Sequence, residues 1–257
     1  MWRVTNAKAP FYLLGSIHVL RSTDYPLPFV FDQAIQQSQL FYFEFDPKRG
    51  DDYRHKLEAA ANLPHGVEIK DRVHPKTWEY LRSTARGGNL QWTHWKAWVI
   101  AEFVLDYPMQ NTFQYSLGVD NYVVRKADAR NCPMRGLERV EDHVAIDAGM
   151  NDVESEAYLL RAIVYASNSE IHLRQAVADW KAGNVEHLDG ADQPSVREAP
   201  QLDARVLEWR NARWIPVIEK AINSGKPTMV VAGAGHFSGP QGVLGLLRAR
   251  GYQIEQL

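Results

Sequence analysis

Two strand-like segments of this 257-residue chain are each followed by a glycine, two further residues and a histidine. The first pattern is Gly15-Ser-Ile-His18 and the second is Gly233-Ala-Gly-His236. Glycine lets the backbone turn sharply, which can direct the following imidazole over the edge of a sheet. Imidazoles are common ligands of catalytic divalent metals, which keep one coordination position open for water. The repeated pattern therefore favours a metal site, although each histidine can also be explained as a hydrogen-bonded residue near a helix start.

A carboxylate follows a third strand-like segment. Residues 40–45 read Leu-Phe-Tyr-Phe-Glu-Phe, so Glu44 lies in an otherwise apolar and aromatic run. A carboxylate is costly to bury without a partner. We therefore expect Glu44 to join the two histidines as a metal ligand, to lie at the exposed end of its strand, or to pair with an arginine.

These residues belong to a chain in which strand-like and helix-like segments alternate. We predict strands at 2–4, 11–14, 40–45, 133–137, 227–232 and 252–255, and helices at 26–37, 118–130, 141–182, 203–222 and 240–250. The alternation predicts an α/β fold with a central, largely parallel sheet and flanking helices. In such a sheet, ligands bind beyond the carboxyl ends of the strands. Residues 189–200 are predicted to form a loop, and Pro216 is expected to kink or divide its helix.

Several motifs occur in a fixed order along the chain. They are Leu13–Leu20, Tyr25-Pro-Leu-Pro28, Phe43-Glu44, Gly136-Leu-Glu138, Arg210-Asn211, Gly233–Gly239, Gly242-Val-Leu244 and Leu247–Tyr252, with Gly118-Val-Asp120 as a looser match. Together they resemble the TraB/GumN family, which includes the Tiki proteases. The resemblance covers nearly the whole chain and is weak from about 50 to 115. It implies an erythromycin esterase/ChaN-like fold, and we expect one domain over residues 1–257 with a helical insertion at about 50–115.

The resemblance also implies a chemistry. In the Tiki members, two Gly-x-x-His motifs and a glutamate are required for a manganese- or cobalt-dependent peptidase activity. Carried over to this chain, the metal ligands are His18, His236 and Glu44. The expected function is therefore a metal-dependent hydrolase of the peptidase type. Its cofactor is a divalent metal, manganese or cobalt first and zinc or iron as alternatives, and its substrate is a peptide or protein.

Further residues are candidates for the same pocket. We expect Glu44 to bind the metal or to act as a general base, and Arg210 to stabilise a developing oxyanion. Glu138 is a third catalytic candidate without an assigned step. Asn211 and Asp120 are further pocket candidates, and Asp120 can also be explained as a favourable charge at a helix start. The other histidines, at positions 55, 65, 74, 94, 143, 172 and 187, show no ligand spacing and are predicted to lie outside the site.

Two alternative functions remain open on sequence alone. One is a non-catalytic protein that uses the same pocket to bind haem or another ligand. The other is a protein-interaction module, because Trp92, Trp95 and Trp98 recur at a spacing of three and would share one helix face. Such a stripe is more often part of a core or interface than a ligand site.

Composition excludes several classes of protein. The chain has 29 Lys plus Arg and 31 Asp plus Glu, so its net charge of −2 lacks the basic excess of a nucleic-acid-binding domain. No apolar stretch approaches the roughly 18 residues of a membrane-spanning helix. The first residues do not resemble a signal peptide. We therefore expect a cytoplasmic protein, or an exported one if a leader precedes this sequence. The single cysteine, Cys132, excludes an intrachain disulfide framework.

Overall fold

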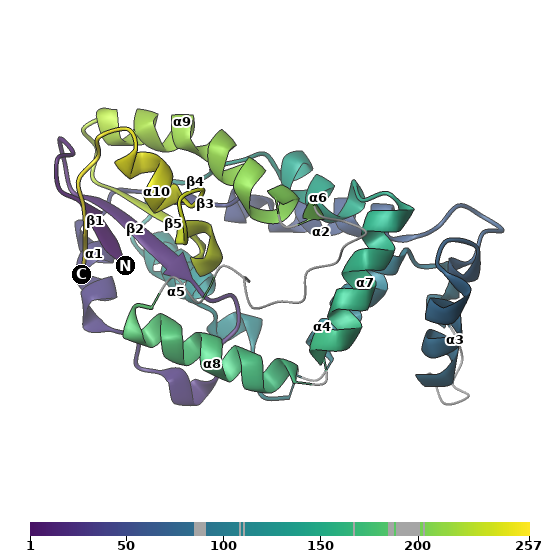
Figure 1. Cartoon of the computed structure of the whole chain (residues 1–257). Coiled ribbons are helices and arrows are strands. Elements are labelled where there is room, and N and C mark those ends of the chain that lie inside the picture. The colour runs from purple at the N-terminus through teal and green to yellow at the C-terminus, as the bar shows by residue number, and fades with distance from the viewer. Residues whose placement is uncertain are drawn as a thin grey trace.

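The computed structural model describes residues 1–84, 91–107, 109, 111–166, 168–184, 188, 201–202 and 204–257. In this part of the chain, six strands form one sheet in the order β4-β3-β5-β2-β1-β6 (Figure 1). They are β1 (Trp2–Val4), β2 (Phe11–Ser16), β3 (Leu40–Phe43), β4 (Met134–Gly136), β5 (Thr228–Gly233) and β6 (Ile254–Gln256). The predicted strands are confirmed at all six places, with small differences at their ends.

The strands β4, β3, β5 and β2 run parallel to one another, whereas β1 is antiparallel to β2 and to β6. The expected α/β fold with a largely parallel sheet is therefore confirmed. Parallel strands have their carboxyl ends at the same edge of the sheet. Because β3, β5 and β2 are neighbours, the residues that follow them come together at this edge: Glu44, His236 and His18.

Helices cover both faces of the sheet. Successive residues of a strand point to opposite faces. Leu13 and Val230 pack against α9 and α10, and Leu14 and Val231 pack against α1, α5 and α8 on the other face. The bounds of these helices are α1 (Phe29–Gln37), α5 (Val119–Ala129), α8 (Ser169–Ala182), α9 (Trp209–Asn223) and α10 (Val243–Arg248). The central strands are continuously apolar because both of their faces are covered.

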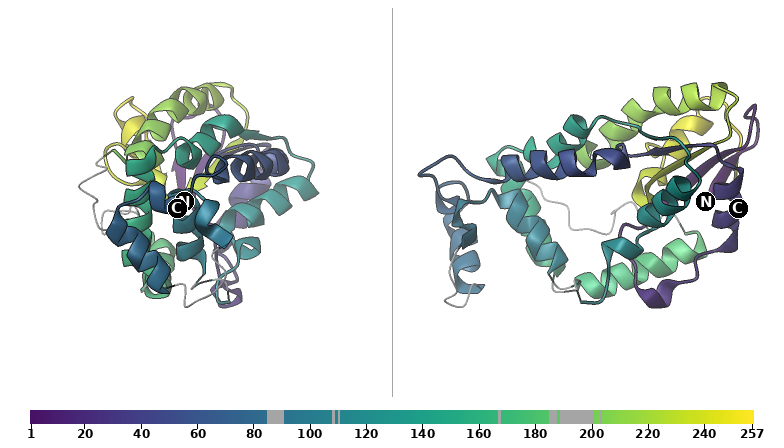
Figure 2. Two further views of the ribbon diagram at one scale, coloured as in Figure 1. Left: turned by 90° about the vertical axis from the view of Figure 1, so that its right-hand side faces the viewer. Right: turned by 180° about the vertical axis from the view of Figure 1, so that it is seen from behind.

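A helical region extends from the sheet on the side away from the chain termini (Figures 1 and 2). It contains α2 (Gly50–Ala61), α3 (Pro75–Thr84) and α4 (Ala97–Asp106) from the segment between β3 and α5, and α6 (Val140–Ala148) and α7 (Asp152–Ala166) from the segment after β4. The apolar residues Ile100 and Ala101 of α4 and Leu159 and Ala162 of α7 are buried in one cluster. No helix in the described ranges combines the length and apolar character needed to cross a membrane.

The three tryptophans at positions 92, 95 and 98 do not share one helix face, so that prediction is wrong. Lys96 donates its backbone N–H to the carbonyl of Ala61 at the end of α2, and α4 begins only after this contact. Trp98 is buried, whereas Trp92 and Trp95 are half-buried and pack against the cluster of α4 and α7. The three indoles contribute to packing, which removes the main support for a docking role.

The last long helix also differs from the prediction. α9 continues through Pro216 and is not divided there. Proline deprives the carbonyl four residues earlier of its partner, but both Pro216 and Ala212 are exposed, so solvent can satisfy that oxygen. The change in helix type lies earlier, because Ala204–Glu208 form a π-helix directly before α9. Residue 203 and the predicted loop at 189–200 lie outside the described residues.

The close contact between α5 and the His18 turn leads to a stability prediction. A Cβ added to Gly118 would lie 2.0 Å from the carbonyl oxygen of His18, whereas a Cβ added to Gly50 meets nothing within 4 Å. Gly118→Ala must therefore displace backbone, and we expect it to lower the free energy of unfolding by about 1–3 kcal/mol. Gly50→Ala is the matched control, because Gly50 has a helical backbone and alanine favours helices by up to about 1 kcal/mol.

Urea denaturation followed by circular dichroism measures both variants under the same conditions. Equal stability of Gly118→Ala and Gly50→Ala would contradict the backbone contact that positions His18.

Candidate active site

The carboxyl edge of the sheet brings the three sequence-predicted metal ligands together. Oε1 of Glu44 lies 4.0 Å from Nε2 of His18 and 3.8 Å from Nε2 of His236. Glu44 directly follows β3, His18 follows β2, and His236 lies in the short 3-10 helix after β5. Gly233 leaves space between the three side chains, since a Cβ there would lie 3.2 Å from Nε2 of His18 and 3.3 Å from Oε1 of Glu44.

His18 is held by Asp120 at the start of α5. Nδ1 of His18 donates to Oδ2 of Asp120 over 2.9 Å, and Ser16 donates its hydroxyl to Oδ1 of the same carboxylate over 2.9 Å. The negative charge of Asp120 is the main cause that raises the pKa of His18 to about 9. The His18 side chain is 55% exposed. Asp120 contacts this histidine and orients its ring.

His236 is buried, and its hydrogen bonds define its tautomer. Nδ1 lies 2.6 Å from Oδ1 of Asn211, whose amide nitrogen donates to the carbonyl of Gln241. Nε2 lies 3.0 Å from Nη1 of Arg210. A guanidinium only donates, so Nε2 accepts and Nδ1 carries the proton. Burial lowers the pKa of His236 to about 3, which agrees with a neutral imidazole.

Glu44 is a buried carboxylate with a partner for each oxygen. Oε1 accepts from the backbone N–H of Gly233 over 2.7 Å, and Oε2 accepts from Nη2 of Arg210 over 2.5 Å. Burial is the largest single influence and would raise the pKa of Glu44, but the surrounding charges, that of Arg210 first, together outweigh it and hold the pKa well below its ordinary value. Of the alternatives left open by the sequence, the structure shows Glu44 paired with an arginine next to both histidines.

Arg210 also binds Glu138, which follows β4. Nη2 and Nε of Arg210 donate to Oε1 of Glu138 over 2.8 and 3.1 Å. Oε2 of Glu138 accepts from the indole N–H of Trp214 over 2.9 Å, and Oε1 lies 2.6 Å from Nδ1 of His143. The guanidinium is 4% exposed. A buried charge requires such compensation, and Arg210 is thereby fixed between two carboxylates.

The position of His143 corrects a prediction from the sequence. We expected it outside the site, but its imidazole contacts Glu138 and makes a tilted ring contact with Phe45 and an edge-on contact with Tyr53. Its signal in the sequence was weak, because His143 follows Glu138 by five residues and no ligand pattern includes it. Ser16 and Trp214 were also missed, since only the tertiary structure brings a hydroxyl and an indole to these carboxylates.

His18, Glu44 and His236 are side chains of the types that bind divalent metals, and both Nε2 atoms lie within 4.0 Å of Oε1 of Glu44. Each histidine gives its Nδ1–H to an oxygen, as metal-binding histidines usually do. One condition follows from Arg210. Because Nη1 donates to the lone pair of His236 Nε2, His236 can bind a metal only after the guanidinium leaves that contact.

Glu44, Glu138 and His143 form a second possible metal-binding group, because one ligand atom of each lies within 4.8 Å of the others. Nη2 of Arg210 lies among them, 2.5 Å from Glu44, 2.8 Å from Glu138 and 3.2 Å from His143. A metal in this second group would have to replace a buried cation. In the set that includes His18, this side chain is 55% exposed and can be reached from solvent, and we favour the set for that reason.

The TraB/PrgY/gumN family matches residues 1–256, essentially the whole chain. The chain belongs to this family. The resemblance inferred from the strand-end motifs is therefore confirmed, including the segment from about 50 to 115 where the motifs are weak. No curated protein and no solved structure matches the chain.

The hydrogen bond between Asp120 and His18 leads to a testable pKa. Replacing Asp120 with asparagine removes the main negative charge near the imidazole, so we expect the pKa of His18 to fall from about 9 toward its ordinary value near 6.5. NMR titration of the histidine ring signals measures this change. Ser16→Ala is the control, because it removes a hydrogen bond to Asp120 and keeps the carboxylate. An unchanged pKa of His18 in Asp120→Asn would contradict the assigned contact.

Proposed function

We propose that this protein is a metal-dependent hydrolase and that its substrates are peptides. One observation carries the proposal: two imidazole Nε2 atoms face the same carboxylate oxygen, at 4.0 and 3.8 Å, while both Nδ1 atoms are bound to outer oxygens. That arrangement supports a cation held by His18, His236 and Glu44. The same residues match those that the Tiki members require for peptidase activity, which supports a peptide as substrate.

The charges of the site also favour a bound cation. Two buried carboxylates, Glu44 and Glu138, contact one permanent positive charge, that of Arg210. Protonated His18 and its partner Asp120 add one positive and one negative charge, so one negative charge is left. A divalent metal would neutralise this excess negative charge. Manganese and cobalt are the first candidates, and zinc and iron are alternatives. When bound, the metal supplies Lewis-acid activation of water and of a substrate carbonyl.

The residues of the chain then have separate roles in the proposal. Asp120 and Asn211 hold the two imidazoles with Nε2 toward the site. Glu44 binds the metal or accepts a proton from the attacking water, which requires its ionised form, and Arg210 keeps that form stable. Glu138 is a positioning residue, because its oxygens are used by Arg210, Trp214 and His143.

Arg210 has a further role that its position supports. Its guanidinium is next to His236 Nε2, and Nη1 would have to leave this partner for His236 to bind a metal. The freed N–H groups would lie beside the reacting carbonyl, where a fixed guanidinium stabilises a developing oxyanion.

The metal site can be tested without turnover. Manganese, cobalt and zinc should each be titrated while the thermal unfolding of the protein is followed. A metal at a hundredfold its Kd stabilises the native state by about 2.7 kcal/mol. We expect wild type to be stabilised by at least one of these metals, and more strongly at higher pH because His18 must lose its proton.

The variant for this test is His18→Ala combined with His236→Gln, and we expect it to lose the stabilisation. The matched control replaces two exposed histidines outside the site, His55 and His94, with alanine. The metal site would be disproved by equal stabilisation of both double variants, or by no stabilisation of wild type with any of the three metals.

Hydrolysis is tested separately with a peptide library and the metal that stabilises the protein best. We expect wild type to cleave peptides and Glu44→Gln to be slower by about 100-fold or more, the usual contribution of a general base. Glu58→Gln on the exposed side of α2 is the control. A folded Glu44→Gln that retains full activity would overturn the role of Glu44. Metal binding without cleavage would leave a binding protein in place of a peptidase.

A further inference from the structure

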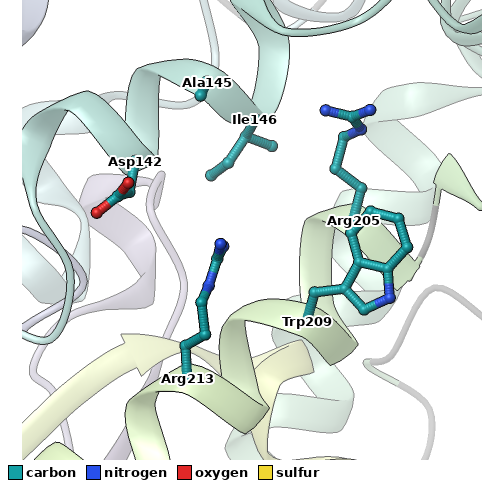
Figure 3. A pocket seen from close by; sticks show the side chains of 6 residues that line it. All are labelled: Asp142, Ala145, Ile146, Arg205, Trp209 and Arg213. Carbon is teal, nitrogen blue, oxygen red and sulfur yellow. The ribbon is translucent and has the colours of Figure 1, made fainter.

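A second cavity lies outside the candidate active site, between α6 and the start of α9 (Figure 3). Its volume is about 250 Å³. It is lined by residues of α6, of the π-helix and of α9: Asp142, Ala145, Ile146, Arg205, Trp209 and Arg213. Pockets for drug-sized ligands usually measure roughly 300–1,000 Å³. This cavity therefore suits a smaller molecule, about the size of an amino acid.

One guanidinium group in this cavity has unused donors. Among the described residues, Arg213 makes no hydrogen bond or ion pair, and its side chain extends from α9 toward α6 (Figure 3). Arg205 binds Glu154 through Nη2 over 3.0 and 3.1 Å, and its Nε is shielded from the cavity, so it contributes mainly its charge. An oxyanion in the cavity would satisfy the donors of Arg213.

The carboxylate that lines the cavity is already neutralised. Asp142 accepts two hydrogen bonds from Arg139, over 2.9 and 3.1 Å. The charged residues that line the cavity are two arginines, Arg205 and Arg213, and one carboxylate, Asp142, so the excess charge is positive. A small anion is favoured over a cation.

The rest of the wall is apolar. Ile146 is buried, and the indole of Trp209 is 44% exposed beside Arg205 (Figure 3). An inorganic ion would leave this surface uncovered. A ligand with an apolar or aromatic body next to its anionic group would contact both the Arg213 guanidinium and the indole.

We propose that the cavity between α6 and α9 is a binding site for a small organic carboxylate with an apolar or aromatic body, of which an acylated amino acid is an example. The carboxylate lies against Arg213 in the positive field of Arg205, and the body covers Trp209, Ala145 and Ile146. This site is separate from the metal-binding residues and does not depend on the hydrolase function. It nevertheless lies between the two helices that carry His143 and Arg210.

The test uses two probes that differ only in charge, N-acetylphenylalanine and its neutral amide. Binding is followed by NMR through the indole N–H signal of Trp209, which Trp209→Phe identifies. We expect a saturable shift of this signal with the carboxylate and none with the amide. Neither a metal nor turnover is needed, so the result is independent of the proposed peptidase activity.

The variant is Arg213→Gln, and we expect it to weaken binding of N-acetylphenylalanine at least tenfold. Arg213 is exposed, and its replacement removes no hydrogen bond within the described residues, so the fold should be kept; an unchanged Tm checks this. Arg82→Gln on α3 removes the same charge from an exposed arginine far from the cavity and is the matched control.

Three results would overturn the proposal. They are no saturable shift with N-acetylphenylalanine, equal binding of the carboxylate and the amide, and equal affinities of wild type and Arg213→Gln. Inorganic phosphate is the third probe. If phosphate shifts the Trp209 signal and N-acetylphenylalanine does not, the cavity binds simple oxyanions and the proposed class of ligand is wrong. If phosphate only competes with bound N-acetylphenylalanine, the assignment of the carboxylate to Arg213 is supported.

Discussion

Burying two carboxylates at the carboxyl edge of the sheet requires a cation between them, and Arg210 is that cation. Its guanidinium lies 2.5 Å from Glu44 and 2.8 Å from Glu138, and it is almost completely shielded from solvent. Removing one partner of such a group leaves an uncompensated buried charge, which commonly costs several kcal/mol. The packing around Arg210 depends on the same charges, because Trp214 and His143 both bind Glu138, the carboxylate that holds the arginine in place.

The sheet and the helices contribute different parts of the site. The parallel strands bring the imidazoles and Glu44 to one edge, and the glycine at the end of β5 keeps the space between them open. The helices supply the partners that orient those groups: Asp120 at the start of α5, and Asn211 with Arg210 at the start of α9. Each imidazole is thereby held through Nδ1, with Nε2 toward Glu44. This preorganisation is the physical basis for proposing a metal at the edge of the sheet.

α9 links this site to the second cavity. The π-helix and the first turns of α9 place Arg210 and Asn211 toward the sheet, and they place Arg205, Trp209 and Arg213 toward α6. π-helical turns are rare and often occur at functional sites. A ligand between α6 and α9 would contact the same two elements that hold His143 and Arg210. The two sites therefore share supporting structure although their chemistry differs.

The sequence by itself determined the largely parallel sheet, because its strands and helices alternate along the chain. It also determined that His18, Glu44 and His236 follow strands, because a strand and the residues just after it are local in the chain. Family membership was equally readable from ordered motifs. The contacts that decide the site are not local. The sequence could not place Arg210 against Glu44 and Glu138, since these contacts join the start of α9 to the ends of β3 and β4. It also could not show that Trp92, Trp95 and Trp98 do not share one helix. A spacing of three fits a helix, but the backbone at Lys96 bonds to the end of α2, and α4 begins only after it. Only the tertiary structure brought the guanidinium of Arg210 to Nε2 of His236, one of the predicted metal ligands, since this contact joins α9 to the turn after β5.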